Sequence, residues 1–353
     1  MTQIVSKSIP VDSVYLQKFV QSCFVKAGLR EEDAALIARS LIESNLRGIV
    51  SHGAERLPHY LNRIRHGSIK PQPNIQTHQH APALARVDGD HGMGQLAMQR
   101  ATNEAVALAR ESGAGWVAVE NSTHCGALAF YGLQIAKANM MAIVFTHSDS
   151  MVVPHAAQHA FCGTNPLCFA MPGGNGADLC LDMATSIVPW NTISNAAIEG
   201  VSIPDNWAVD GDGKPTTSPK EVRGVRPFGG HKGSGLGLMI DVFCSFLLGT
   251  PYGPHIAPMY GDPSKKRLLG GLVGAIDISK FRPPAQFRAT VSTLTAEWNA
   301  QSRANPDEPV LFPGQPEMIT RRERLAKGIP LGVNLVDIFS KLSAELDVPW
   351  KIG

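Results

Sequence analysis

The chain has 353 residues, of which 44% are hydrophobic and 18% charged, and its formal net charge is +2. This composition is typical of a globular protein with a sizeable core, and the length favours two closely packed parts over one domain. A net charge this small, with no run of Lys or Arg and no basic stripe interleaved with aromatic residues, argues against binding to nucleic acid.

No targeting or membrane segment is expected. Residues 1–7 lack the charged start and apolar core of a signal peptide. No apolar stretch approaches the about 20 residues that cross a bilayer, so we expect no membrane association and a cytoplasmic location. The cysteines lie in apolar contexts without a Cys-x-x-Cys pair, which predicts buried free thiols. They are Cys23, Cys125, Cys162, Cys168, Cys180 and Cys244.

The first part of the chain, residues 1–72, is predicted to be helical. Apolar residues recur with helical spacing from Val14 onward, after an N-cap at Asp12 or Ser13. Helices are predicted over residues 14–28, 31–46 and 54–65. The turn before the third of these, residues 47–53, is unusually rich in polar side chains for a connection between helices.

A mixed α/β pattern follows a predicted linker marked by Pro71, Pro73 and Pro82. Strands are predicted over residues 84–87, 115–119, 141–145, 167–171 and 179–181. Helices are predicted over residues 95–111, 127–138, 190–199, 236–248 and 317–346. The helix over 236–248 is expected to be buried because it is apolar nearly all round.

Five polar or glycine-bearing clusters stand at the ends of these apolar runs. Because apolar runs form rigid strands or helices, the groups at their ends can converge on one pocket while the chain between them builds the core. We therefore expect an active site assembled from loops. The clusters cover residues 121–126, 146–150, 163–166, 181–186 and 229–235.

A Rossmann dinucleotide fingerprint is matched only formally. Gly92-Met93-Gly94-Gln95-Leu96-Ala97 fits the pattern after a possible strand, but a polar insert separates the two and no series of βα units follows. We interpret it as a turn and the start of a helix. The glycine cluster at 229–235 has two possible interpretations. One is an anion-binding site formed by free backbone N–H groups, the start of a helix and Lys232, and the other is a flexible turn.

Histidines near arginines are the best candidates for acid–base chemistry. His124 follows an apolar run, and an imidazole can take a proton from a hydroxyl and return it. His52 lies in the polar turn with Arg47 and Arg56 nearby, and guanidinium groups bind carboxylates with two hydrogen bonds. The combination suggests a substrate that carries a carboxylate. A purely structural role for His124 is the alternative.

The sequence lacks the motifs of several other enzyme classes. There is no H-E-x-x-H, and His155 with His159 has no neighbouring acid, so no metal site is predicted and a zinc-dependent hydrolase is a remote alternative. No G-x-S-x-G nucleophile elbow is present. The non-enzyme alternative is a ligand-binding protein that does not catalyse a reaction.

Taken in order, these motifs resemble the malate/L-lactate dehydrogenase family of the non-Rossmann type, which includes ureidoglycolate and sulfolactate dehydrogenases. The resemblance extends over residues 14–342. The matching motifs cover residues 51–53, 121–126, 163–166, 181–186, 227–233 and 313–317. It implies an α/β fold with a large mixed β-sheet in a cofactor-binding and catalytic domain, residues 73–316. A helical part formed by residues 1–72 and 317–353 would pack against it, and homodimers are implied.

The resemblance also implies roles for individual residues. His124 looks like the proton acceptor. In imine-reducing relatives the residues matching His52 and Asp182 are a candidate acid pair, so these two are also candidate catalytic residues. The substrate-pocket residues are Ser51, His52, Arg56 and Tyr60. The cofactor contacts are Ser148, Asp182, Met183, Ala184, Lys232, Gly314, Gln315 and Pro316.

The reaction implied by the resemblance is oxidation of a 2-hydroxy acid with NAD or NADP, NAD being favoured. His124 removes the hydroxyl proton while hydride passes to the nicotinamide, and Arg56 holds the carboxylate. Residues 124–128, 148–154 and 259–262 are more similar to ureidoglycolate dehydrogenases than to the malate or lactate branch, which favours ureidoglycolate as the substrate. The alternative is a dehydrogenase of malate, lactate or a related 2-hydroxy acid, or a ketoacid reductase. His147 and Pro189-Trp190-Asn191 depart from the usual family pattern.

Overall fold

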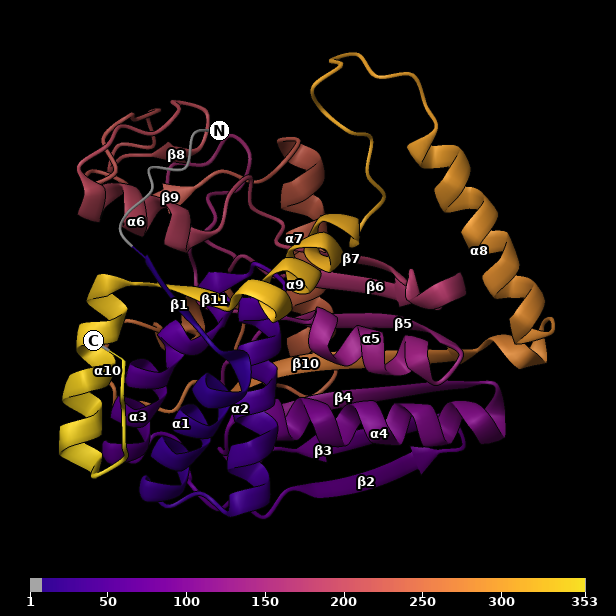
Figure 1. The fold of residues 1–353 in the computed structure, drawn as a ribbon, viewed down its shortest axis with the longest axis horizontal. Helices are drawn as coiled ribbons and strands as arrows, with labels where there is room; N and C mark the ends of the chain where they lie inside the picture. The colour runs from indigo at the N-terminus through magenta and orange to yellow at the C-terminus, as the bar shows by residue number, and fades with distance from the viewer. Residues whose placement is uncertain (1–7, 353) are drawn as a thin grey trace.

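The computed structural model describes residues 8–352 of the chain (Figure 1). Residues 1–7, where the sequence predicts no signal peptide, lie outside that range. No helix among the described residues has the length and apolar character needed to cross a membrane. All six cysteines are buried free thiols, as predicted.

A seven-stranded mixed sheet forms the centre of the molecule, in the order β2-β3-β4-β10-β5-β6-β7 (Figure 1). β3 and β4 are parallel, and the other neighbouring strands are antiparallel. The predicted fold class, α/β with a large mixed sheet, is confirmed. The strands are β2 Gln76–Ala81, β3 Leu84–Asp88, β4 Ala114–Ser122, β5 Met140–Thr146, β6 Leu167–Met171, β7 Leu179–Met183 and β10 Leu269–Asp277.

Helices cover both faces of this sheet (Figure 1). α4 (Gly94–Ser112) and α5 (Ala129–Lys137) share a hydrophobic core with one face, in which small residues of α4 meet valines of the strands. α7 (His231–Ser245) lies on the other face, where Ile240 and Cys244 pack against Leu167. The sheet is therefore the middle layer of three.

Elements from both ends of the chain share a second core beside the sheet (Figure 1). Its buried side chains include Phe19, Leu41, Leu57 and Phe339. These come from α1 Ser13–Lys26, α2 Glu31–Leu46, α3 Leu57–Arg65 and α10 Val333–Leu346. β1 (Ser8–Val11) and β11 (Ile329–Gly332) pair antiparallel, which joins the two ends directly.

Several predicted elements are wrong in extent. β2 lies inside the predicted linker. The predicted helix 317–346 is α9 (Gln315–Lys327), then β11, then α10, because Gly328 at φ +91° ends the first helix. The predicted buried helix 236–248 begins earlier, at His231, and it is not buried all round, since Phe243 and Phe246 are 47% and 60% exposed.

The remaining elements lie at the periphery of the sheet. α6 (Trp190–Glu199) is as predicted, and it packs in a small cluster with β8 (Ala208–Val209) and β9 (Gly224–Val225). α8 (Pro284–Asn299), for which the sequence analysis made no prediction, stands along one edge of the molecule (Figure 1). The polar turn 47–53 contains the 3-10 helix η1 (Val50–His52), followed by η2 (Ala54–Arg56).

Candidate active site

A cavity of about 450 Å³ is lined by residues of the polar turn, of the strand ends and of the loops that follow them. Four of the five clusters contribute to it, so the expected convergence occurs for these four. The fifth, residues 229–235, contributes nothing beyond its neighbour Phe228, and its glycines turn the chain into α7. The residues of the four clusters at the cavity are His124, Gly126, Ser148, Thr164, Pro166, Asp182, Met183, Ala184 and Ser186.

His124 lies in this cavity with one ring nitrogen engaged by the protein. Tyr60 Oη is 2.6 Å from its Nδ1, and the Gly126 N–H donates to the same nitrogen over 3.4 Å. Nε2 makes no hydrogen bond within residues 8–352. Burial, assisted by the nearby His52 and Arg56, holds the pKa of His124 well below its ordinary value. The imidazole is therefore neutral at physiological pH, as a proton acceptor must be.

His52 stacks on His124, with 5.3 Å between the ring centroids. Its Nδ1 is 2.9 Å from Ser51 Oγ. Burial, with Arg56 as the second cause, lowers the pKa of His52 to about 3. Two neutral imidazoles therefore face the same cavity.

Arg56 is held at all three guanidinium nitrogens. Nε donates to Ser51 O at 2.6 Å, Nη1 to Tyr260 Oη at 2.8 Å and Nη2 to Asn191 Oδ1 at 3.0 Å. A guanidinium carries five N–H hydrogens, so two are left after these three bonds. Arg56 can thus hold a carboxylate without releasing its protein partners.

Asp182 lines the cavity at the end of β7, where its Oδ2 accepts the Ala129 N–H at 2.7 Å. Desolvation raises the pKa of this carboxyl to about 6, against the Ala129 hydrogen bond and the charge of Arg47, which favour the ionised form. No hydrogen bond joins Asp182 to His52 within the described residues, although both reach the cavity.

Ser148 offers a hydroxyl to the cavity. Its Oγ accepts the Thr164 N–H at 3.2 Å, and its own hydrogen has no acceptor within residues 8–352. A Cβ at Gly163 would lie 2.3 Å from Ser148 Oγ, so glycine is required there. The Ser148 N–H donates to Asn165 Oδ1, and Asn165 Nδ2 donates to Gly237 O of α7. The cluster 163–166 therefore positions Ser148.

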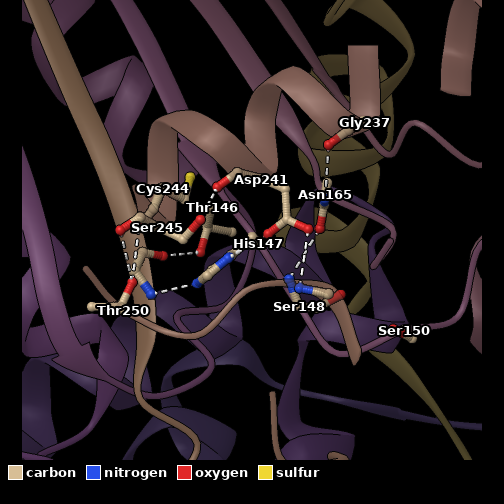
Figure 2. Close-up of polar contacts among 12 residues, drawn as sticks. Thr146, His147, Ser148, Ser150, Asn165, Gly237, Asp241, Cys244, Ser245 and Thr250 are labelled. Atoms are coloured by element: carbon tan, nitrogen blue, oxygen red, sulfur yellow. Dashed lines mark hydrogen bonds and ion pairs between the residues drawn. The ribbon is translucent and has the colours of Figure 1, made fainter. Parts of the chain in front are cut away.

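His147, which the sequence analysis noted as a departure from the family pattern, connects the end of β5 to α7 and β10 (Figure 2). Gly270 N–H donates to its Nε2 at 2.7 Å, so the ring hydrogen is on Nδ1 and is donated to Asp241 Oδ1 at 2.8 Å. Asp241 Oδ2 accepts the Gly253 N–H at 3.2 Å. Both side chains are almost fully buried. The pair ties α7 to the end of β5.

Asp149 connects this strand end to a distant loop. Its carboxylate accepts the Met259 N–H at 3.1 Å and forms a buried ion pair with Arg267. Arg63 donates to Met259 O at 2.9 Å. The neighbouring Tyr260 reaches Arg56 from this loop. The sequence analysis singled out both segments as substrate-related, but not the contact between them.

The residues predicted to hold NAD or NADP are gathered only in part. Ser148, Asp182, Met183 and Ala184 line the cavity together with the apolar walls Leu128, Met151 and Pro166. This hydroxyl between apolar walls fits a nicotinamide ring with its carboxamide. Lys232 in the first turn of α7, and Gly314, Gln315 and Pro316 at the start of α9, do not line the cavity.

Asn191 and Tyr260 are site residues that the sequence analysis assigned no role. The sequence analysis did single out both segments, residues 189–191 as a departure from the family pattern and residues 259–262 as similar to ureidoglycolate dehydrogenases. Within residues 8–352, no group of three or more His, Cys, Asp or Glu side chains could hold a metal ion.

Comparison with known proteins identifies the family. The profile of the malate/L-lactate dehydrogenase family matches residues 11–339. The chain is 36% identical to ureidoglycolate dehydrogenase (NAD(+)) of Escherichia coli O157:H7 over 330 residues, 94% of each chain. It is 34% identical to malate dehydrogenase of Pyrococcus abyssi, over 96% of this chain and 95% of that one.

A solved structure shows the same fold. Malate dehydrogenase from Entamoeba histolytica superposes with a TM-score of 0.93 at 26% identity, over 98% of this chain and 100% of that one. Sequence and fold agree over almost the entire length. The chain therefore belongs to the malate/L-lactate dehydrogenase family, oxidoreductases that act on the CH–OH group of hydroxy acids.

Proposed function

We propose that the protein oxidises a 2-hydroxy acid with NAD or NADP and that ureidoglycolate is its substrate. The observation that carries the proposal is the pairing, in one cavity, of a neutral imidazole with a guanidinium that has two hydrogens left for a carboxylate. A hydroxyl next to a carboxylate is the substrate group that such a pair fits.

In the oxidative direction each residue has one task. Arg56 holds the carboxylate and thereby orients the carbon to be oxidised. His124 takes the hydroxyl proton at Nε2, and His52 stacked on it helps to exclude water. A bound nicotinamide would supply the hydride acceptor. We assign the residues near it as Ser148, Asp182, Met183 and Ala184, with Lys232, Gly314, Gln315 and Pro316 as more distant contacts.

The wall around Arg56 supports a substrate with a neutral distal group. Asn191 and Tyr260 contact Arg56, and their neighbours in the chain Ile187, Pro189, Trp190 and Met259 also line the cavity. The charge of the other arginine at the cavity, Arg47, favours the ionised form of Asp182 by lowering its pKa. Malate and sulfolactate carry a second anionic group, which a neutral wall would leave without a counter-charge. Asn191 Nδ2, with no partner in residues 8–352, could donate to a ureido carbonyl.

The proposal is tested by following absorbance at 340 nm with NAD or NADP and a panel of (S)-ureidoglycolate, malate, lactate and sulfolactate. We expect turnover of ureidoglycolate above the others, and NAD preferred, as in the relative named for NAD(+). His124→Ala should abolish most activity, whereas the exposed His78→Ala should not. Turnover of none of the acids with either cofactor would refute the proposal.

We also propose that the protein is a homodimer. One face of α7 and the residues after it expose a row of large apolar side chains. An exposed apolar face of this kind marks a contact between proteins. The side chains at helical spacing are Leu236, Met239, Phe243, Phe246 and Leu247. Sedimentation or light scattering tests this proposal, and Phe246→Asp should release monomers.

A helical part composed of residues 1–72 and 317–353 is likewise our proposal for the domain division. Its support is the core shared by α1, α2, α3 and α10.

A further inference from the structure

The formal glycine motif at residues 92–97 has a role at the catalytic histidine instead of at a dinucleotide. Gly94 begins α4, and a Cβ there would lie 2.3 Å from Thr123 O and 2.7 Å from the carbonyl carbon of His124. The Gly94 N–H donates to Thr123 Oγ1 at 2.9 Å. Glycine therefore lets the helix start against the backbone of His124.

This close approach brings Gln95 to Tyr60. Gln95 is completely buried, and its Nε2 lies 3.3 Å from Tyr60 Oη. Its Oε1 is buried without a hydrogen-bond partner among the described residues. Tyr60 Oη in turn lies 2.6 Å from His124 Nδ1. The three side chains form one buried chain of hydrogen bonds that ends at the catalytic ring.

The direction of this chain fixes the tautomer of His124. When Gln95 donates through Nε2, the Tyr60 oxygen accepts, its hydrogen goes to His124 Nδ1, and the neutral ring must carry its own hydrogen on Nε2. That tautomer has no lone pair at Nε2 for a substrate proton.

A half-turn of the Gln95 amide reverses the chain, because it exchanges Nε2 and Oε1. Oε1 then accepts the Tyr60 hydrogen, and the Tyr60 oxygen accepts Nδ1–H of His124. This bond over 2.6 Å replaces the longer bond of 3.4 Å in which Nδ1 accepts the Gly126 N–H. Nε2 of His124 is left with its lone pair. The half-turn gives Oε1, which is buried without a hydrogen-bond partner among the described residues, the Tyr60 hydroxyl as a donor, and it moves the amide N–H groups to the position that Oε1 leaves.

We propose that Gln95 is a positioning residue that sets the tautomer of His124 through Tyr60. The inference rests on the proposed function of His124 as the proton acceptor. In the oxidation, the substrate hydroxyl proton goes to Nε2, the C–H pair leaves as hydride to the nicotinamide, and the carbonyl forms. Tyr60 meanwhile keeps accepting Nδ1–H from the resulting imidazolium, and Gln95 keeps accepting from Tyr60.

A double-mutant cycle tests the connection. Gln95→Met keeps the volume and removes the acceptor, so kcat for oxidation should fall about 10-fold or more, while the KM of the acid and the Kd of NADH stay near wild type. Tyr60→Phe should have a similar effect, and adding Gln95→Met to it should cost little more. The matched control is Gln99→Met, one turn further along α4, where Gln99 bonds Gln134 instead.

A second measurement needs no substrate and therefore separates this inference from the proposed function. In protein labelled with ¹⁵N-histidine, His124 is assigned by comparison with His124→Asn. We expect the His124 ring of the wild type to be hydrogen-bearing at Nδ1, and Gln95→Met to shift it toward the Nε2–H form. An unchanged tautomer in Gln95→Met would overturn the inference. So would losses of kcat that simply multiply in the double variant.

Discussion

Met259 donates its backbone N–H to the Asp149 carboxylate, although the two residues are 110 positions apart in the chain. Ser148, the proposed nicotinamide contact, immediately precedes Asp149, and Tyr260, which holds Arg56, immediately follows Met259. One hydrogen bond therefore connects the cofactor side of the cavity to the carboxylate clamp.

Asp149 should accordingly control substrate affinity. Asp149→Leu removes the acceptor of the Met259 N–H and leaves the Arg267 guanidinium buried without its counter-charge, which we expect to destabilise the protein by about 3–5 kcal/mol. The double variant Asp149→Leu/Arg267→Met removes both charges and should recover part of that loss. If Asp149 positions the loop, both variants raise the KM of the acid and leave the Kd of NADH near wild type. An unchanged KM in the folded double variant would contradict this.

His124→Gln should lower kcat by about 10²–10⁴-fold, because a general base contributes a factor of this size. The fold should persist, since glutamine can still bond Tyr60. Thermal unfolding followed by circular dichroism, alongside steady-state kinetics, distinguishes the two effects. Retention of more than about a tenth of wild-type kcat would exclude His124 as the base.

The lowered histidine pKa values predict how stability depends on pH. The pKa of His52 is about 3 in the folded protein and 6.5 ordinarily, so its neutral form belongs to the native state. The stabilisation is fully present above pH 6.5 and is lost as pH falls from there through the folded pKa. Urea unfolding at pH 7 and pH 5 should show this loss, and His52→Asn should reduce it. An identical pH dependence in the variant would count against the shift.

His147 and Asp241 should contribute to the free energy of unfolding as a coupled pair and not independently (Figure 2). His147→Leu leaves Asp241 Oδ1 and the Gly270 N–H without their hydrogen-bond partner, and we expect a loss of at least about 1–3 kcal/mol. His147→Leu/Asp241→Leu should lose less than the two single variants combined, because it leaves no buried charge. Urea titration of all three variants measures this coupling, and strict additivity would disprove it.

Asn191 should decide between neutral and anionic distal groups. Asn191→Lys places a cation next to Arg56, so the ratio of kcat/KM for malate to that for ureidoglycolate should rise about 10-fold, or about 1.4 kcal/mol. Asn191→Leu is the matched control, since it removes the amide and adds no charge. A ratio that moves equally in both variants would show that charge is not the cause.

Local signals explain which elements the sequence could predict. α1 has its N-cap, Asp12, whose side chain accepts the Tyr15 N–H, and α6 has the predicted bounds. β10 was not predicted, because Gly270, Gly271 and Gly274 interrupt its apolar sequence. A Cβ at Gly274 would lie 2.5 Å from the Trp116 ring, and one at Gly270 only 1.9 Å from Cys244 O. These glycines allow close packing between segments that are distant in the chain, and no local sequence pattern predicts such packing.

The site residues likewise fall into those that local motifs predict and those that only the fold reveals. Motifs predicted His124, His52 and Arg56 because each lies in a short polar cluster. Their partners come from elsewhere in the chain, and only folding brings Tyr260 and Asn191 to Arg56. The exposed face of α7 was not predicted for a related reason, since an apolar sequence does not by itself distinguish a buried helix from one with an exposed apolar face.

The three anchors of Arg56 also affect how tightly a small acid can bind. A free arginine side chain loses rotamer entropy when it grips a ligand, at about 0.5–1.5 kcal/mol for each side chain immobilised. Arg56 is already fixed by Ser51, Tyr260 and Asn191 when the carboxylate arrives. The rotamer entropy of Arg56 is therefore lost during folding and not during binding. A ligand with only a few atoms can bind this rigid side chain without that cost.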